Sequence, residues 1–457
     1  MEEHTAFLPG LSPIEGKQLQ VAFDGGMLSS DGGVLLLREV ERKLGIADRL
    51  AACLPDPLRQ RVSAASRRDP GRIDHTIAEM IRFRAFAIAA GYQDADDCDA
   101  LRGEPVFKMA LGRAPASGAS LCSQPTMSRL ENAPSRVTLI RMMAAMVDLF
   151  CDSWHHVPSR IELDIDDTWD EAHGAQQLSF FNAHYDGHGF LPMHIYEATS
   201  GKLVAAILRP GKTPGGQEAR TILKHVVKRI RKHWPKVEIL VRGDSHYGRP
   251  EVQDWCEDNR LGTVFGLAGN AVLAAMVAPL AEDAALRRLA RGGETKVRRY
   301  ADLRYAAKSW RAARRVIARV EASDRGVDSR FVVTNLAAKP KALYETVYCA
   351  RGRMENLIKA HKTHLASDRT SCHGANANQF RLILHSVAYW LLQGVQATAP
   401  RRSSWRLAQF DTLRTRLIKL AARVVETATR IKVHLPSACP DKAIIFHLAR
   451  AFAAQGP

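Results

Sequence analysis

The spacing of apolar residues predicts that the chain begins with helices. Apolar side chains recur at helical spacing over residues 34–44, 73–90 and 139–150. Gly91 directly follows the second of these stretches, and a glycine in that position is typical of a helix end. Residues 1–155 are therefore predicted to be mostly helical.

From residue 160 the apolar residues follow the period of strands. Residues 161–166 alternate between apolar and acidic side chains, as expected of a strand with one polar face. The further elements expected here are a hairpin over 190–197 and 203–208, an amphipathic helix around 222–230, a strand over 237–241, a helix over 250–258 and a strand over 263–267. The order strand, hairpin, helix, strand, helix, strand is that of an RNase H-like fold, so the predicted fold class is α/β.

Beyond this core the pattern changes again. Residues 271–338 contain basic, alternating stretches that predict a β-strand insertion. Residues 379–395 have the composition of a long buried helix, and residues 401–457 open on a basic segment with leucines at helical spacing. That segment fits either a solvated surface helix or a helix that contacts phosphates. The predicted regions are 1–155, a core formed by 156–270 and 339–400, the insertion 271–338, and a basic helical C-terminal region 401–457.

The charge of the chain indicates a polyanionic partner. Its 457 residues carry a formal net charge of +17, and neutralising phosphates releases counterions. No apolar stretch approaches the ~20 residues of a membrane-spanning helix, and the basic residues are spread along the whole chain. We therefore expect nucleic acid as the partner and no membrane. The eight cysteines are scattered without a CxxC pair, which indicates reduced thiols, as in a cytoplasm.

A short amphipathic stretch near residue 125 is a candidate for reading DNA. Residues 123–131 begin with a possible serine cap and predict the last helix of a helix-turn-helix. Gln124 and Arg129 are residue types that reach bases and phosphates. The alternative is a surface helix that packs through Met127 and Leu130. Both interpretations fit the sequence, and the first makes residues 1–155 a DNA-binding region.

The stretch Tyr348–Lys362 is predicted to be a helix with an unusual polar edge. At roughly 100° per residue, Tyr348, Arg351, Glu355 and Lys362 fall close together around the helix axis. One carboxylate, two cations and a phenol on one edge suit metal binding combined with a grip on phosphate. A surface helix stabilised by ion pairs is the alternative.

Two aspartates at predicted strand ends complete a candidate metal site. Asp166 and Asp244 follow strands of the α/β core, and chemistry in open α/β sheets gathers at such ends. Together with Glu355 they provide the hard oxygen ligands that Mg²⁺ prefers. A pair of Mg²⁺ ions can activate a water or 3′-hydroxyl and stabilise the leaving oxygen; we expect Mn²⁺ to substitute. Asp164 shares the strand face of Asp166 and is expected to support it, whereas Asp167 is expected to point away.

These motifs resemble those of a known family. The spacing Y-x2-R-x3-E-x6-K over 348–362 resembles the signature of DDE transposases from bacterial insertion sequences. Asp166-Asp-Thr168 and Arg242-Gly-Asp244-Ser resemble their first and second aspartate motifs. The amino-acid sequence of several stretches, including 123–132 and 368–370, resembles that of transposases of the insertion sequence 1380 family, which is related to the insertion sequence 4 group. The resemblance covers nearly the whole chain.

The resemblance implies a function and partners. Such an enzyme would cut double-stranded DNA at the ends of its mobile element and join them to target DNA. Tyr348, Arg351 and Lys362 would hold DNA phosphates near Glu355. A homodimer would form in the DNA complex, in a bacterial cytoplasm and associated with the nucleoid.

One position departs from the family pattern. Some relatives carry a tryptophan directly after the motif arginine to stack on a flipped base, and here that position is Gly352. We therefore expect the stacking face to come from the insertion, with Trp310 as first candidate and Tyr300 and Tyr305 as others. The alternative for Trp310 is packing within the insertion.

Three other functions fit parts of the sequence. A nuclease of the same fold would cut DNA but never join it. A non-catalytic DNA-binding protein would keep the charge but not need the intact carboxylates. A zinc hydrolase would use His173, His184 and His188 with Asp166, although their spacing matches no known ligand pattern.

Overall fold

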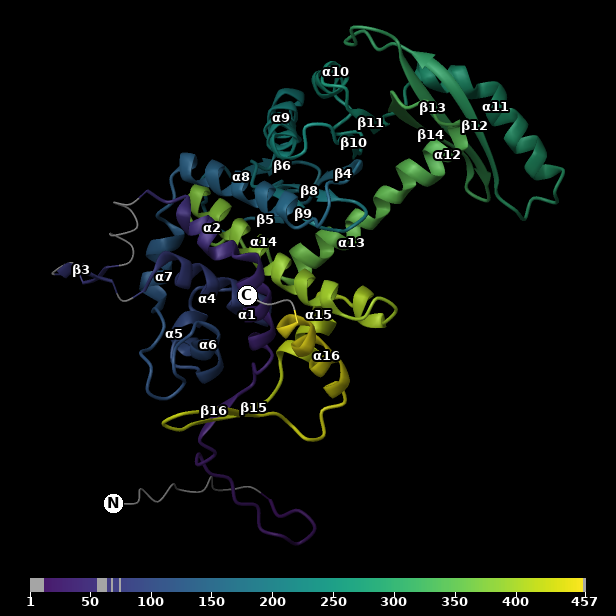
Figure 1. Ribbon diagram of the computed structural model, residues 1–457. Coiled ribbons are helices and arrows are strands. Elements are labelled where there is room, and N and C mark those ends of the chain that lie inside the picture. The colour runs from purple at the N-terminus through teal and green to yellow at the C-terminus, as the bar shows by residue number, and fades with distance from the viewer. Residues whose placement is uncertain (1–11, 56–63, 67–68, 74, 455–457) are drawn as a thin grey trace. The chain divides into compact units, whose positions relative to one another are not determined.

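Two compact units make up the protein (Figure 1). The computed structural model describes residues 12–55, 64–66, 69–73 and 75–454. The terminal unit combines both ends of the chain, Met1–Ala133 and Leu391–Pro457, and the central unit is the continuous stretch Pro134–Trp390. The two ends thus belong to one unit, whereas the sequence pattern treated them as two separate regions.

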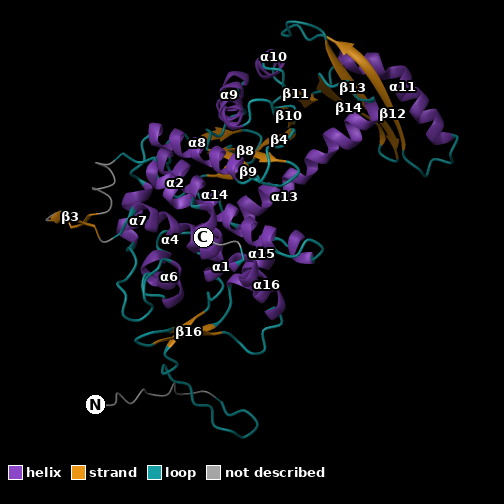
Figure 2. Cartoon of the chain, viewed as in Figure 1, coloured by secondary structure: helices purple, strands orange, loops and turns teal. Residues whose placement is uncertain are grey.

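An eight-stranded mixed sheet forms the framework of the central unit (Figure 2). Its strand order is β12-β13-β14-β11-β10-β4-β8-β9. Strands β4, β10 and β11 run parallel, and the other pairings are antiparallel. The bounds are β4 Arg160–Asp167, β8 Met193–Glu197, β9 Leu203–Ile207, β10 Glu238–Gly243, β11 Gly262–Leu267, β12 Val297–Tyr305, β13 Arg314–Ser323 and β14 Gly326–Thr334.

Helices precede or connect the core strands as the sequence predicted. Helix α8 (Arg136–Asp152) precedes β4, α9 (Gly216–His233) leads from β9 to β10, and α10 (Pro250–Asp258) leads from β10 to β11. Apolar residues at helical spacing in α9, such as Leu223 and Ile230, are completely buried. Pro250 lies in the first turn of α10, where its missing N–H removes no helical hydrogen bond.

The insertion between β11 and the predicted catalytic helix contains a helix that the sequence pattern did not predict. Three strands occur where alternating stretches predicted them, but a helix, α11 (Ala271–Leu289), precedes them, and Asn270 caps it by accepting a hydrogen bond from the backbone of Leu273. The strands form no separate layer, because β14 pairs with β11 and extends the main sheet. Buried residues such as Val264, Ile317 and Val332 form one continuous core across the join.

The predicted catalytic helix is not one regular α-helix. The helical run consists of α12 (Pro340–Ala342), a π-helical turn η1 (Leu343–Tyr348), a 3₁₀ turn η2 (Cys349–Gly352), α13 (Arg353–Lys359) and a second π-helical turn η3 (Ala360–His364). Some of its carbonyls serve groups outside the helix: Val347 accepts a hydrogen bond from Arg242 at 2.8 Å and Leu357 accepts one from Tyr196 at 3.3 Å. Because the pitch changes several times, a constant angle per residue does not predict which side chains share a face.

The long helix predicted over 379–395 is confirmed as α14 (Ala375–Thr398), which continues from the central into the terminal unit. Within the central unit its side chains bind the edge of the sheet. Tyr389 donates to the carbonyl of Gly201 at 2.8 Å, and Trp390 donates to that of Leu203 at 3.1 Å. α14 is therefore a core helix.

The terminal unit is mainly helical. Its elements are α1 (Val34–Leu44), α2 (Ile46–Ala52), α4 (Ile77–Ala90), α5 (Asp97–Leu101), α6 (Pro105–Ala110), α7 (Gln124–Glu131), η4 (Ser404–Leu407), α15 (Phe410–Leu413), η5 (Arg414–Ile418), α16 (Lys442–Ala453), a sheet β1 (Met27–Ser29), β15 (Ala422–Glu426) and β16 (Ile431–His434), and a pair β2 (Ala64–Ser66) and β3 (Asp69–Ile73). Helix α4 ends at Gly91 as predicted, but it begins after Thr76, whose side chain caps it, because Ile73 belongs to β3.

The C-terminal region, which was predicted to be helical, contains a β-hairpin as well as helices. Its leucine spacing is realised only as far as η5, after which β15 and β16 form a hairpin. The backbone N–H groups of Gly32 and Gly33 donate to the carbonyls of Leu420 and Ile418. A Cβ at Gly33 would lie 1.7 Å from the carbonyl oxygen of Leu417. The segment around Gly32 and Gly33 thus occupies backbone carbonyls that would otherwise accept hydrogen bonds within a continuing helix.

No helix among residues 12–55, 64–66, 69–73 and 75–454 is long and apolar enough to cross a membrane.

Candidate active site

Asp166 and Asp244 leave neighbouring parallel strands at the same edge of the sheet. Gly243 and Ile165 form the last residue pair between β10 and β4, and each aspartate directly follows one member of this pair. The pKa of Asp166 is raised to about 7: burial is the main cause, Arg351 opposes it, and the carboxylates of Asp244 and Asp167 add to it. The two predicted aspartates are thus close enough to interact electrostatically.

Asp164 lies on the same strand face as Asp166, but both of its carboxylate oxygens are already hydrogen-bonded. It is 1% exposed, and its two oxygens accept hydrogen bonds from Arg242 at 2.6 and 2.8 Å. Arg242 also lies 3.0 Å from Glu162 and donates to the carbonyl of Val347. Asp164 therefore fixes Arg242, which in turn ties β4, β10 and η1 together. This arrangement favours Asp166 over Asp164 as the metal ligand.

The loop after Asp244 brings in groups that the sequence analysis missed. Asp167 was expected to point away, but its Oδ2 accepts a hydrogen bond from Tyr247 at 3.1 Å and lies 3.6 Å from Nδ1 of His246. The same nitrogen lies 3.8 Å from Asp244, so His246 faces both carboxylates. The nearby carboxylate of Asp167 raises the pKa of His246. The motif Ser-His-Tyr directly after Asp244 was the available signal.

Tyr348 and Arg351 do approach the strand ends. The Nη1 atom of Arg351 lies 3.4 Å from Oδ2 of Asp166. The hydroxyl of Tyr348 lies beside Gly266, where a Cβ would be 2.9 Å from that oxygen and 3.1 Å from the carbonyl carbon of Asp244. Both side chains are half-buried. One helical run therefore directs a phenol and a guanidinium at the two aspartates.

Lys362 also points to this edge of the sheet, but its ammonium group is already bound. It donates to the backbone carbonyl of Trp169 and lies 3.8 Å from Oδ1 of Asp170, a carboxylate that is 1% exposed. Burial raises the pKa of Asp170 to about 8, while Lys362 lowers it. Lys362 is thus placed to position the chain after the first aspartate.

Glu355 is not part of the carboxylate pair. It lies in the first turn of α13, and its side chain is exposed. Leu357, from the same helix, binds Tyr196, which is paired with Asp164 and so points to the same sheet face. Glu355 therefore comes from a helix on the correct face, but no described group of three His, Cys, Asp or Glu residues is close enough to hold a metal ion.

That finding also bears on the zinc hydrolase alternative. His173, His184 and His188 are all exposed. His184 packs its ring edge-on against Tyr185, and His188 packs against Phe181. These histidines form no described cluster with Asp166, so the alternative gains no support.

Trp310 lies away from the aspartates. Gly243, which precedes Asp244, pairs with Phe265 of β11, and Phe265 pairs with Val333 of β14. These residues mark the height of the aspartates across the sheet. Trp310 precedes β13, whose first residue, Arg314, lies on the side of the strands' amino ends. Its ring is covered by Arg314 at 5.2 Å, and Arg314 binds Asp254 and Glu257 of α10. Trp310 therefore packs against Arg314 before the start of β13 and not beside the aspartates.

The α7 segment in the terminal unit packs as a surface helix would, and its interpretation as a DNA-reading helix stays a prediction. Met127 and Leu130 are completely buried, as a packing helix requires. Arg129 is exposed and donates to Thr126 at 2.8 Å, whereas the side chain of Gln124 is partly exposed. The helix is anchored on one side and leaves polar groups on the other.

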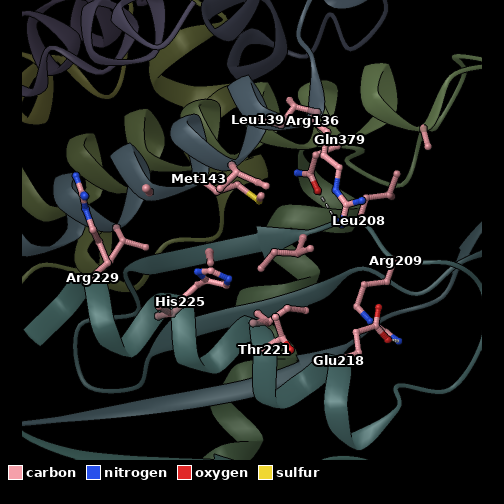
Figure 3. Close-up of a pocket in the computed structure, with 18 of the residues that line it drawn as sticks. Arg136, Leu139, Met143, Leu208, Arg209, Glu218, Thr221, His225, Arg229 and Gln379 are labelled. Atoms are coloured by element: carbon pink, nitrogen blue, oxygen red, sulfur yellow. Dashed lines mark hydrogen bonds and ion pairs between the residues drawn. The ribbon is translucent and has the colours of Figure 1, made fainter.

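A cavity of about 1040 Å³ lies between α8, β9, α9 and the start of α14 (Figure 3). Its walls are largely apolar, with Leu139, Met143 and Ile222 among them, and basic residues such as Arg229 line its rim. It contains none of the candidate catalytic residues, so it is not the site of the chemistry suggested by the aspartates.

Two buried histidines lie behind Asp166, and we expect them to make the stability of the protein sensitive to acid. His194 pairs with Asp166 in the register of β8 and β4, and its ring centroid lies 5.1 Å from that of His361. Both residues are completely buried. Burial lowers the pKa of His194 to about 4 and that of His361 well below its ordinary value. Tyr196 and Tyr389 complete the surroundings.

We expect His194→Phe to reduce this acid sensitivity. The unfolded chain takes up a proton at His194 below about pH 6.5, whereas the folded protein does so only near pH 4, so stability is present above 6.5 and falls as the pH falls through this window. Between pH 7.5 and 5.0, urea unfolding should show that the free energy of unfolding falls by roughly 2 kcal/mol more in the wild type than in His194→Phe. The control is His188→Phe, at an exposed histidine, which should keep the wild-type slope. Equal slopes for all three proteins would contradict the assignment.

Comparison with known proteins gives one family match. Residues 11–456 match the family described as Transposase DDE domain group 1. Among solved structures, the chain is similar to the piggyBac transposase in a cryo-EM structure of its synaptic complex with hairpin DNA. The two are 11% identical, the match covers 85% of this chain and 80% of that chain, and the TM-score is 0.45. No curated protein matches the sequence.

Proposed function

We propose, from the premise that this chain belongs to the Transposase DDE domain group 1 family, that it cuts DNA at the ends of its mobile element with Asp166, Asp244 and Glu355. As a DDE transposase the chain is an enzyme of DNA cleavage and strand transfer. The observation that carries the residue assignment is the pair of aspartates at the ends of adjacent parallel strands, close enough for Asp244 to raise the pKa of Asp166.

The aspartate pair fits a divalent metal ion. DDE transposases generally depend on one. Asp166 and Asp244 offer hard oxygens, and the repulsion between the two carboxylates is what a bound cation would relieve. We propose two Mg²⁺ ions, with Mn²⁺ as a substitute; when bound, they would activate the attacking water or 3′-hydroxyl and stabilise the leaving oxygen.

Glu355 would join the pair when DNA binds. Three observations support this: its side chain is exposed, its helix packs on the sheet face of Asp166, and it directly follows the 3₁₀ turn η2. Gly352, at the end of that turn, has no heavy atom within 4 Å of the position of a Cβ. A change of helical pitch at η2 would turn Glu355 about the helix axis.

The cationic and phenolic groups have separate roles in this proposal. Arg351 and Tyr348 would bind the phosphate next to the cut, because they already point at the aspartates. Lys362 was expected to hold phosphate as well, but its bond to the carbonyl of Trp169 supports a positioning role.

The finer assignment also remains a proposal. We assign the chain to the insertion sequence 1380 group because of the amino-acid sequence of residues 123–132 and 368–370. We also propose that it acts as a homodimer on the DNA in a bacterial cytoplasm. The strand order β9-β8-β4-β10-β11, in which β8 alone runs antiparallel to its neighbours, supports an RNase H-like core.

A strand-transfer assay tests the proposed function. A duplex from the DNA flanking its own gene, ending in a free 3′-hydroxyl, is incubated with the protein, Mg²⁺ and a supercoiled target plasmid. We expect the duplex to become covalently joined to the plasmid. Cleavage of flanking DNA without any joined product would favour the nuclease alternative, and binding without cleavage would favour a non-catalytic DNA-binding protein.

The polar side of α7 provides a prediction about sequence recognition. Replacing Gln124 and Arg129 together with alanine should lower the ratio of affinities for element ends and random DNA by about 5- to 150-fold, the value of one good base contact. The affinity for random DNA should fall less, because phosphate contacts mainly hold the DNA. The control is Arg423→Ala, at an exposed arginine of β15, which should weaken both affinities equally. An unchanged ratio at fixed salt would assign α7 to packing alone.

A further inference from the structure

The cavity in Figure 3 plays no part in the proposed cutting of DNA, yet it has the make-up of a ligand site. Its volume is about 1040 Å³, and all of its lining residues belong to the central unit; we call it the α8–α9 cavity. Phe190 also lines it, from the end of β7 (Gly187–Phe190), which pairs with β5 (Asp170–Glu171) and β6 (Phe180–Asn182) in a small sheet. Sites for small molecules measure about 300–1,000 Å³ and combine apolar walls with a few polar groups. The cavity is therefore large enough for an organic molecule.

Apolar side chains form most of the walls of the α8–α9 cavity. Leu139, Met143 and Val147 line it at a spacing of four residues, so one face of α8 is turned to the cavity. Helix α9 contributes Ile222. Ile140 also lines the cavity and is 48% exposed, whereas Leu139 and Val147 are 3% exposed, so the apolar surface runs from the mouth inwards. Because apolar surface is unfavourable in water, these walls favour an apolar ligand chain.

Three helices begin at the α8–α9 cavity and make part of it positive. Arg136 is the first residue of α8, Gln217 the second of α9 and Ala375 the first of α14, and all three line the cavity. The first N–H groups of a helix lack partners within the helix and carry partial positive charge. Gly215, which precedes α9, provides no side-chain cap. Backbone dipoles thus favour a negative group here.

Arg209, two residues beyond β9, provides a buried donor to this part of the cavity. In Figure 3 it lies beside Glu218 toward the right of the view, and its side chain lines the cavity although it is only 3% exposed. Its Nη1 donates to the carbonyl of Leu191 at 3.1 Å, and its Nη2 donates to Glu218 at 2.6 Å. Among the described residues, its Nε has no hydrogen-bond partner. Because a buried donor without a partner is unfavourable, an acceptor on a ligand would be favoured at this atom.

The basic residues at the other end of the cavity offer less to a ligand. Arg229 lies toward the left of the view in Figure 3 and donates to both oxygens of Asp148, with 2.6 Å between its Nε and Oδ1. Lys228 and Lys232 are exposed, so water already solvates their ammonium groups. The buried guanidinium of Arg209 is therefore the group that would fix the orientation of a ligand.

We propose that the α8–α9 cavity binds a free long-chain carboxylate, with its chain along the apolar walls and its head group at Nε of Arg209. Arg136 and Arg209 outnumber the one carboxylate of Glu218 at this end, and a guanidinium forms strong hydrogen bonds with carboxylates. A free molecule fits better than a membrane surface, because the donor is buried and only a head group that enters the cavity reaches it. The proposal stands apart from the catalytic assignment, since neither catalytic aspartate lines the cavity.

A fluorescent fatty acid tests the proposal with the full-length protein. The probe is cis-parinaric acid, kept monomeric, whose conjugated chain becomes bright when it leaves water for an apolar site. We expect saturable binding of one molecule per chain. The methyl ester has the same chain without the charge, and it should bind about 10- to 150-fold more weakly, the value of a hydrogen bond to a charged group. Equal affinities for acid and ester would overturn the proposal.

Two neighbouring alanines of α8 provide a matched pair of variants. Both are partly exposed, but Ala144 lines the cavity, whereas Ala145, also among the described residues, does not. Ala144→Phe fills the cavity without changing any charge, so it should weaken binding of the acid by about tenfold or more. Ala145→Phe should bind like the wild type. If Ala144→Phe also binds like the wild type, the acid lies elsewhere on the basic surface and the proposal fails. The comparison of acid with ester uses the wild type, so it decides the question even if Ala144→Phe does not fold.

Two further arms test the position of the head group and the source of the ligand. Glu218→Gln removes a competing negative charge, so it should tighten binding of the acid by up to about fivefold and leave the ester unchanged. Weaker binding of the acid would place the head group away from Arg209 and contradict the proposal. Phosphatidylglycerol vesicles present similar chains and negative charge on a surface, and the wild type and Ala144→Phe should bind them equally. Loss of vesicle binding in Ala144→Phe would assign the cavity to a membrane surface and overturn the proposal of a free ligand.

Discussion

Replacing Asp244 with asparagine should lower the rate of DNA cleavage by about 10³-fold or more and leave DNA affinity nearly unchanged. Metal ions contribute several kcal/mol to the stabilisation of charge in such a transition state, and each 1.4 kcal/mol corresponds to about tenfold in rate. The asparagine side chain has the size of the aspartate it replaces, but its neutral amide binds Mg²⁺ weakly. The net charge of +17 would change by one unit, so the attraction to phosphate would remain.

This effect is measured by single-turnover cleavage of element-end DNA, with affinity measured at the same salt concentration. Asp166→Asn and Glu355→Gln should behave in the same way, whereas Arg351→Ala should slow the reaction less, because the proposed role of Arg351 is to bind phosphate and not metal. Asp324→Asn is the matched control, since this exposed carboxylate lies in the turn between β13 and β14. A wild-type cleavage rate in Asp244→Asn would rule out the assignment.

Replacing Arg242 with methionine should lower the free energy of unfolding by about 3–5 kcal/mol, because it leaves the buried carboxylate of Asp164 without its partner. Asp164 is 1% exposed and accepts two hydrogen bonds from Arg242. Burial raises the pKa of Asp164 and Arg242 lowers it. Urea unfolding at pH 7.5 measures the effect. An exposed ion pair would be worth less than about 1 kcal/mol, so Arg287→Met, which breaks the exposed pair with Asp283, is the control.

The double variant Asp164→Leu with Arg242→Met separates stability from positioning. Replacing both members of a buried ion pair by apolar residues is often neutral for stability, so we expect the double variant to recover most of the loss. Cleavage should remain slow, because Arg242 also holds the carbonyl of Val347 just before Tyr348. A double variant that is both stable and fully active would show that the ion pair has no role in positioning η1.

The position of the two aspartates could be predicted because it depends on simple periods. Alternation over 161–166 and the apolar stretch 237–241 predicted neighbouring strands, and the ends of parallel strands meet at one edge. The preference for Asp166 over Asp164 came from the resemblance alone. Its physical reason is the pairing of Asp164 with Arg242, which is 78 positions further along the chain.

Other features could not be predicted because they depend on tertiary contacts. The helical run around Glu355 changes pitch, and groups from β8 and β10 bind its carbonyls, so a constant angle per residue is not enough to predict how Glu355 lies relative to its neighbours. Lys362 has the residue type of a phosphate ligand, but its ammonium group donates a hydrogen bond to the nearby Trp169 carbonyl.

The measurement that tests the central claim most directly is metal-dependent cleavage of the DNA that flanks the chain's own gene. The full-length protein is incubated with a linear duplex that carries both element ends, with Mg²⁺, with Mn²⁺ or with a chelator, and the products are mapped to the nucleotide. We predict cuts at the element ends that leave 3′-hydroxyl groups, in either metal and not in the chelator, and none with Glu355→Gln. Cleavage that continues in the chelator, or at the wild-type rate in Glu355→Gln, would contradict the account.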